Sequence, residues 1–167
     1  MVFRYGDSHT LPPGQEKITS TDNFAGVTLG TRAMTQDGRV FRYCFSAGAI
    51  GAGFLTTAPA ITPSALASDL ILVTAAVGAK SITASHASAN AATINFYKDG
   101  YVFIHDGAGE GHLHLIQGHD ASASDAVAIT LRLGDDVVRE ALASGSSLGG
   151  IVRNPYTEIV EWPTTSV

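Results

Sequence analysis

Three histidines, His105, His112 and His114, are the residues of this chain whose type and spacing could support metal chemistry. Imidazole nitrogens are common zinc ligands, and three of them with one water would complete a four-coordinate site. His112 and His114 are two residues apart, so in a β-strand both side chains point to the same face. If His105 pairs with His112 across the glycine-rich segment between them, the third imidazole joins the other two. A zinc site is therefore one hypothesis.

The residues that follow the histidines argue against a metal. A His-x-His pair of the cupin type expects a carboxylate a few residues later, and Gln117 and Gly118 stand there instead. The sequence shows no acidic side chain that would orient the imidazoles from behind. We therefore expect these histidines to bind no metal and the chain to carry no cofactor. A surface role, as a contact between subunits, is the better interpretation of the three imidazoles.

Two other patterns suggest a hydrolase site and a calcium site, and each lacks residues that such a site needs. The segment Gly145–Gly149 matches the hydrolase pattern Gly-x-Ser-x-Gly, which needs a helix after the serine and a histidine later in the chain. All six histidines precede Ser147, so a glycine–serine turn is the better interpretation. Asp106 and Glu110 are too few carboxylates for a calcium site. We expect that this protein is not an enzyme.

The histidines lie in the segment KDGYVFIHDGAGEGHLHLI, residues 98–116, which predicts two short strands joined by a glycine-rich turn. With His105 opposite His112, the period of two predicts a core face. That face comprises Val102, Ile104, Leu113 and Leu115. The opposite face is aromatic and rich in imidazole, and we interpret it as a candidate subunit-contact face comprising Tyr101, Phe103, His105, His112, His114 and Ile116.

The rest of the chain predicts an all-β protein, a small β-sandwich or barrel with an extended N-terminal arm. Strand-like runs recur at a spacing of roughly ten residues with turn signals between them. We expect a β-rich domain over residues 26–167. Residues 1–25 are polar and broken by Pro12-Pro13-Gly14, so we expect an extended arm that is ordered only when something else holds it. Helical turns are expected at most in 86–97 and 135–144.

The composition excludes several classes of function. Hydrophobic residues are 45% and charged residues 15% of the chain, and the formal net charge is -5. Lys and Arg are scattered singly, so nucleic-acid binding would lack its main source of affinity. The single Cys44 excludes an internal disulfide. No apolar run is long enough for a membrane span or an export signal, so we expect no membrane contact. Long aliphatic side chains are sparse, which predicts a thin core that a partner completes.

Several segments together resemble one family. LGTRAMTQDGRVFRY, VGAKSIT, NFYKDGYVFIHDGAGEGHLHLI, AITLRL and NPYTEIV resemble the small capsid decoration (cement) proteins of tailed bacteriophages, over most of the chain from Gly30 to Val160. The resemblance implies a homotrimer that binds the major capsid protein and strengthens the head lattice. It also implies a location on the outer surface of the virion capsid, after synthesis in the host cytoplasm. Such proteins have no catalytic residues to transfer.

Two other classes of function remain open at this point. The first is a carbohydrate- or receptor-binding module of a phage tail or fibre, in which Tyr101 and Phe103 would form a stacking platform. The second is a metal-dependent enzyme built on the histidine face. The mass of the protein under native conditions distinguishes a trimer from a monomeric binding module, and a metal assay tests for the enzyme.

Overall fold

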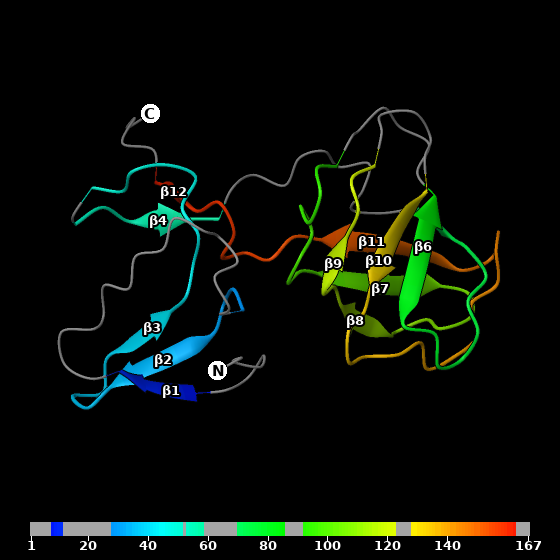
Figure 1. Ribbon diagram of the computed structural model, residues 1–167, viewed down its shortest axis with the longest axis horizontal. Coiled ribbons are helices and arrows are strands. Elements are labelled where there is room, and N and C mark those ends of the chain that lie inside the picture. The colour runs from blue at the N-terminus through cyan, green and yellow to red at the C-terminus, as the bar shows by residue number, and fades with distance from the viewer. Residues whose placement is uncertain are drawn as a thin grey trace. The chain divides into compact units, whose positions relative to one another are not determined.

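The protein is all-β, as the sequence predicts, in a computed structural model that describes residues 8–11, 28–51, 53–58, 70–85, 92–122 and 128–162. Contacts divide the chain into two compact units, shown in Figure 1. Unit 1 comprises residues 1–60 and 155–167, and unit 2 comprises residues 61–154. We expected one domain over residues 26–167, whereas two compact units share this range. Among the described residues there is no helix long and apolar enough to cross a membrane.

The residues of unit 1 that the structure describes form two small sheets. The first has the order β1-β2-β3, with β1 parallel and β3 antiparallel to β2. Its strands are β1 (Ser8–Leu11), β2 (Arg32–Thr35) and β3 (Val40–Arg42). The turn between the antiparallel strands β2 and β3 contains Gly38 at a φ of 86°, which glycine adopts without strain. The second sheet pairs β4 (Thr56–Thr57) with β12 (Val160–Glu161).

The expected N-terminal arm is described in part. Residues 8–11 form strand β1, which pairs with β2 in register from Ser8 opposite Arg32 to Leu11 opposite Thr35. The remaining residues of the expected arm lie outside the described residues. Four residues of the arm are thus extended and paired within the chain itself.

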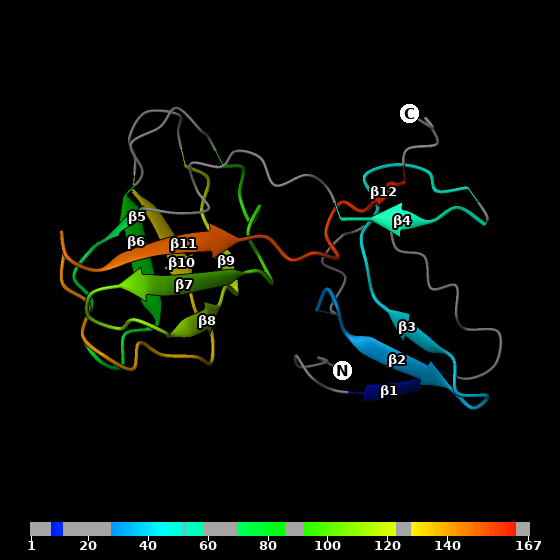
Figure 2. The ribbon, with the colours of Figure 1, turned by 180° about the vertical axis from the view of Figure 1, so that it is seen from behind.

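The described strands of unit 2 form one antiparallel sheet with the strand order β8-β7-β11-β5-β6-β10-β9. In Figure 2, β11, β7 and β8 lie side by side. The strands are β5 (Leu70–Leu72), β6 (Ser81–Ser85), β7 (Tyr101–Asp106), β8 (Leu113–Leu115), β9 (Gly118–His119), β10 (Ile129–Arg132) and β11 (Leu148–Val152).

The two edges of this sheet belong to one continuous segment, residues 113–119. Its first half, β8, pairs with β7, and the N–H of Ile116 continues this pairing by donating to the carbonyl of Gly100 at 2.9 Å. The next residue changes partner, because the N–H of Gln117 donates to the carbonyl of Arg132 at 2.7 Å. The second half, β9, pairs with β10. Because one segment supplies both end strands, the sheet curls round into a small barrel, with β8 paired only to β7 and β9 only to β10.

The interior of the barrel holds the hydrophobic core. Its strands alternate between buried and exposed positions, as Val102 and Ile104 of β7 show. The core side chains are Leu70, Leu72, Ile82, Ala84, Ala92, Tyr97, Val102, Ile104, Ile116, Ile129, Leu131, Leu133, Val138, Leu142 and Ile151. Among the described residues of unit 1, Leu29 is the one buried hydrophobic side chain. Hydrophobic burial is therefore concentrated in unit 2.

The expected helical turns in 135–144 are wrong. This segment is an irregular connection in which Val138 and Leu142 are buried. The N–H of Val138 donates to the carbonyl of Ala79, and the N–H of Leu142 donates to the carbonyl of Ala75. These bonds use the amides that a helix would pair within itself. The described part of 86–97 is likewise a series of turns rather than a helix.

Candidate functional site

The hairpin of β7 and β8 differs from its expected register by one residue. Val102 lies opposite His114 and Phe103 lies opposite Leu113, and the N–H of Ile104 donates to the carbonyl of His112 at 3.0 Å. The expected pairing of His105 with His112 is therefore wrong. Because side chains alternate along a strand, a shift of one residue moves every side chain of β8 to the other face.

The six residues of the expected subunit-contact face consequently do not share a face. His114 and Ile116 are both 0% exposed and lie in the interior of the barrel. His112, two residues before His114, is half-buried and immediately precedes β8. Leu113 and Leu115, which we expected in the core, take the outer positions instead. Tyr101, Phe103 and His105 remain on the outer side of β7.

His114 is a structural residue of the barrel. Its Nδ1 lies 2.9 Å from Oδ2 of Asp136, so the ring donates a hydrogen bond to the carboxylate. Burial raises the pKa of Asp136, but hydrogen bonds from the Val137 N–H and from His114 outweigh burial, so that this pKa lies below its ordinary value. The second carboxylate oxygen accepts a hydrogen bond from Arg139 at 2.9 Å. In the part of the chain that the structure describes, no group of three or more His, Cys, Asp or Glu side chains could hold a metal ion.

Ser147, from the pattern that resembles a hydrolase motif, ties two loops together at one end of the barrel. The glycine–serine turn expected there is confirmed. The side chain of Ser147 is fully buried, and its Oγ donates to the carbonyl of Ala108 at 2.9 Å. The same Oγ accepts a hydrogen bond from the N–H of Ala143 at 3.2 Å. This hydroxyl therefore holds the turns after β7 and before β11 together.

The surface of the barrel that suggests a function is an outer apolar face. It extends over four consecutive strands, β8, β7, β11 and β5. Its side chains alternate with core residues and point away from the interior. Leu113 is 50% exposed and Ile71 is 45% exposed, and the others are half-buried. We define the outer apolar face as Ile71, Tyr101, Phe103, Leu113, Leu115, Leu148 and Val152.

The outward positions of the other strands have a different composition. In β6 they are Ser81, Thr83 and Ser85, and in β10 they are Thr130 and Arg132. The hydroxyls of Thr83 and Thr130 are hydrogen-bonded across the strands at 3.1 Å. The outer surface over β6 and β10 is thus polar, as is usual for a surface in contact with water, whereas the outer apolar face is not. An apolar patch on a folded domain usually marks a contact with another molecule.

Unit 1 has a second exposed apolar patch that the sequence analysis did not single out. It lies around the β4–β12 pair and comprises Ile50, Phe54, Leu55, Val160 and Trp162. Leu55 is 76% exposed and Trp162 is 59% exposed. The N–H of Trp162 donates to the carbonyl of Leu55 at 2.8 Å, which brings the two segments together. The segments are distant in sequence and have no apolar periodicity, so no local pattern could have indicated the patch.

No model of a known protein family, no curated protein and no solved structure matches this chain. The outer apolar face must therefore be interpreted from its own chemistry. The side chains of this face carry one polar group, the Tyr101 hydroxyl. The imidazole of His105, outside the defined face, is also on the outer side of β7, and its ring centroid lies 6.0 Å from that of Phe103. A face of aliphatic and aromatic side chains is better suited to bury area against a protein than to orient a polar ligand.

Proposed function

We propose that this chain is a viral structural protein, a decoration (cement) protein that binds the outer surface of a tailed-phage head and stabilises the shell. Its partners are the major capsid protein and other copies of itself, as a homotrimer. It acts by binding and not by catalysis, and it is located on the outer surface of the capsid after synthesis in the host cytoplasm. The observation that carries this proposal is the outer apolar face of the barrel.

The outer apolar face supports a role in assembly because it is continuous and uncharged. Tyr101 and Phe103 of β7 have Leu113 and Leu115 on one side and Val152 on the other. Aromatic side chains flanked by aliphatic ones are typical of the centre of protein interfaces. Burying apolar surface of this kind stabilises a contact by about 25 cal/mol per Å². Such an energy could reinforce a shell without any chemical step.

The resemblance to decoration proteins supports the same role. Two of the segments that carry it, LGTRAMTQDGRVFRY and NFYKDGYVFIHDGAGEGHLHLI, form the β2–β3 and β7–β8 hairpins, so the motifs coincide with defined structural elements. The net charge of -5 suits the outer surface of a shell better than an interior lined with DNA. By adding contacts across the boundaries between capsomers, the protein would let the shell resist the outward pressure of packaged DNA.

The test uses heads of the virus from which the chain derives, prepared without this protein. We expect the added protein to sediment with these heads and to raise the temperature at which they release DNA. Leu113→Glu places a charge on the outer apolar face and should abolish both effects. The matched control, Thr130→Glu, places the same charge on an exposed position of β10 and should preserve them. Unchanged heads in the presence of the wild-type protein would exclude the proposed role.

The carbohydrate-binding alternative has less support. Tyr101 and Phe103 do point outward from β7, as a stacking platform requires. However, sugar hydroxyls need several polar groups around such a platform, and the flanking residues are Leu113, Leu115 and Val152. A glycan array that showed specific binding, lost in Tyr101→Ala, would favour this alternative over a decoration protein.

A further inference from the structure

Two imidazole nitrogens of the β7–β8 hairpin are buried and have no hydrogen-bond partner among the described residues. They are Nε2 of His114 and Nδ1 of His112. The two rings are neighbours, with their centroids 6.1 Å apart. Leaving a buried polar atom without a partner is costly, so most such atoms in folded proteins bond to some other group. The two nitrogens together are therefore a candidate ligand site.

A carboxylate fixes the other nitrogen of His114. Nδ1 of this ring donates to Oδ2 of Asp136 at 2.9 Å, so the neutral ring carries its proton on Nδ1 and has a free lone pair on Nε2. Histidines that bind metal ions usually have this arrangement, with one nitrogen on the ion and the other donating to a carboxylate or carbonyl. The sequence alone showed no acidic side chain behind the imidazoles, whereas in the folded chain Asp136 takes this position behind His114.

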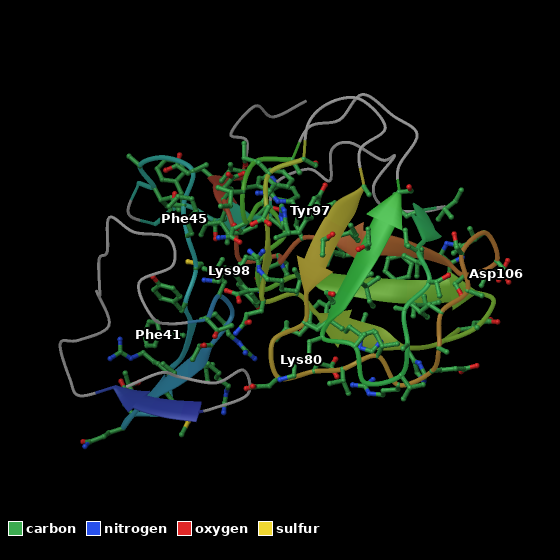
Figure 3. The ribbon with its side chains drawn as sticks, turned by 45° about the vertical axis from the view of Figure 1, so that its right-hand side comes forward. Phe41, Phe45, Lys80, Tyr97, Lys98 and Asp106 are labelled. Carbon is green, nitrogen blue, oxygen red and sulfur yellow. The ribbon has the colours of Figure 1, made fainter. Side chains whose placement is uncertain are left out.

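Asp136 is itself held in one position. Its N–H donates to the carbonyl of Leu133 at 3.1 Å, and its Oδ1 accepts a hydrogen bond from Arg139 at 2.9 Å. The loop that carries it begins beside Lys80, which is labelled in Figure 3, because the N–H of Leu133 donates to the carbonyl of Lys80 at 2.9 Å. The orientation of the His114 ring is thus set before any ligand binds, which lowers the entropic cost of binding.

The separation of the two rings suits one shared ion. A zinc ion bound to an imidazole nitrogen lies about 3.2 Å from the ring centroid, so two rings on one ion have centroids about 5 Å apart at a tetrahedral angle and about 6.3 Å apart at a linear one. The observed 6.1 Å lies within this interval. His112 is half-buried, so water from outside can fill the remaining coordination positions of the ion.

We propose that Nδ1 of His112 and Nε2 of His114 bind one Zn²⁺ ion, with water completing its coordination. The site has two protein ligands rather than the three considered from the sequence, because His105 lies on the outer side of β7. The ion would join the residue that ends the glycine-rich turn to β8 and, through His114, to Asp136. This inference goes beyond the decoration role and does not depend on it, because the isolated chain contains both ligands.

Titration of the untagged, chelator-treated chain with Zn²⁺ tests the site. Isothermal titration calorimetry should find one bound ion per chain. His112→Gln keeps a polar side chain but removes the ligating nitrogen, so this stoichiometric binding should be lost. Because His112 is half-buried and does not belong to the hydrophobic core, the variant should fold as the wild type does, which circular dichroism verifies.

Two further variants separate the ligands from their surroundings. The matched control, His105→Gln, makes the same substitution on the outer side of β7 and should bind Zn²⁺ as the wild type does. Asp136→Asn keeps both ligands but replaces the carboxylate behind His114 with a neutral amide, so the affinity should fall about 10- to 100-fold. In nitrogen NMR spectra of the wild type, Nε2 of His114 and Nδ1 of His112 should be the ring nitrogens whose resonances shift most when Zn²⁺ is added.

Unfolding provides an independent measurement of the same site. An ion that binds the folded chain raises the unfolding midpoint as its concentration increases. Zn²⁺ should therefore raise the midpoint of the wild type and of His105→Gln but not that of His112→Gln. The proposed site is wrong if no stoichiometric ion binds, if His112→Gln binds Zn²⁺ as tightly as the wild type, or if His105→Gln loses the ion. The binding of the protein to heads tests the decoration role separately.

Discussion

The backbone N–H of Tyr97 donates a hydrogen bond of 2.9 Å to Nε2 of the buried His119. On the other side of the ring, Nδ1 of His119 lies 2.7 Å from the carbonyl oxygen of Asp120 and donates to it. The two bonds require the neutral ring with its proton on Nδ1, because Nε2 must accept. The main chain of His119 is also bonded to Asn95, so the turn before β7 is fixed to β9 at several points.

Acid should therefore destabilise the barrel through His119. Burial lowers the pKa of His119 below 6.5, Arg132 acts in the same direction, and the bond to Asp120 opposes both. The unfolded chain then takes up this proton at a higher pH than the folded chain. The hydrogen bonds of neutral His119 therefore stabilise the folded chain fully at pH values above the pKa of His119 in the unfolded chain. This stabilisation declines as the pH falls toward the lower pKa of His119 in the folded chain. Between about pH 7.5 and pH 5, the wild type should lose more stability than His119→Gln in denaturant titrations. Equal losses would contradict this role.

Gly107→Ala should destabilise the protein more than Gly111→Ala. Both glycines have a positive φ, 78° and 84°, so alanine at either position costs about 1–2 kcal/mol of backbone strain. A Cβ on Gly107 would also lie 2.0 Å from the carbonyl oxygen of Ser146, whereas one on Gly111 would have no atom within 4 Å. The difference in unfolding free energy between the two variants isolates the packing of the turn against residues 143–147. Equal destabilisation would show that this contact is not formed in solution.

Substitutions in and beside β8 test the register of its hairpin. Ile116 is fully buried, so Ile116→Ala should lower the unfolding free energy by about 2–5 kcal/mol. Leu113 is 50% exposed on the outer side, and Leu113→Ala should change the stability by less than about 1 kcal/mol. Chemical denaturation at concentrations below self-association measures both. The register expected from the sequence predicts the reverse order, with Leu113 as the core residue.

The sequence was sufficient for the all-β class and for the hairpin of residues 98–116, but not for the register of that hairpin. Alternation of apolar side chains located β7, and the glycine–serine pattern located the turn at Gly145, where φ is 82°. In β8, however, leucine alternates with histidine, and either set could face the core. The decision depends on Asp136, which provides a buried partner for His114 and lies 22 residues away in sequence. Local periodicity contains no information about such a partner.

Long-range pairings explain what else the sequence did not reveal. The barrel closes because residues 113–119 change partner from β7 to β10 between Ile116 and Gln117, and no residue there signals the change. Unit 1 forms because the C-terminal segment returns to residues near Phe45, whose N–H donates to the carbonyl of Tyr156 at 2.9 Å. The outer apolar face could be predicted only in part: Tyr101 and Phe103 were found from β7 alone, whereas Leu113 and Leu115 required the register.

Hydrogen exchange should separate the two units by their stability. The core cluster lies entirely in unit 2, and Leu29 is the single buried hydrophobic side chain among the described residues of unit 1. Because burial of apolar surface is the main source of stability, the amides of β2 and β3 should exchange through local openings of lower free energy than those of β6 and β10. Mass spectrometry of proteolytic fragments measures the rates.

Low concentrations of urea should accelerate exchange in β6 and β10 but leave β2 and β3 nearly unchanged, because only global unfolding exposes a large surface. Binding to heads should then slow exchange in unit 1 if its patch around Leu55 and Trp162 is covered. Equal protection of both units in the free protein would show that unit 1 has a source of stability other than hydrophobic burial.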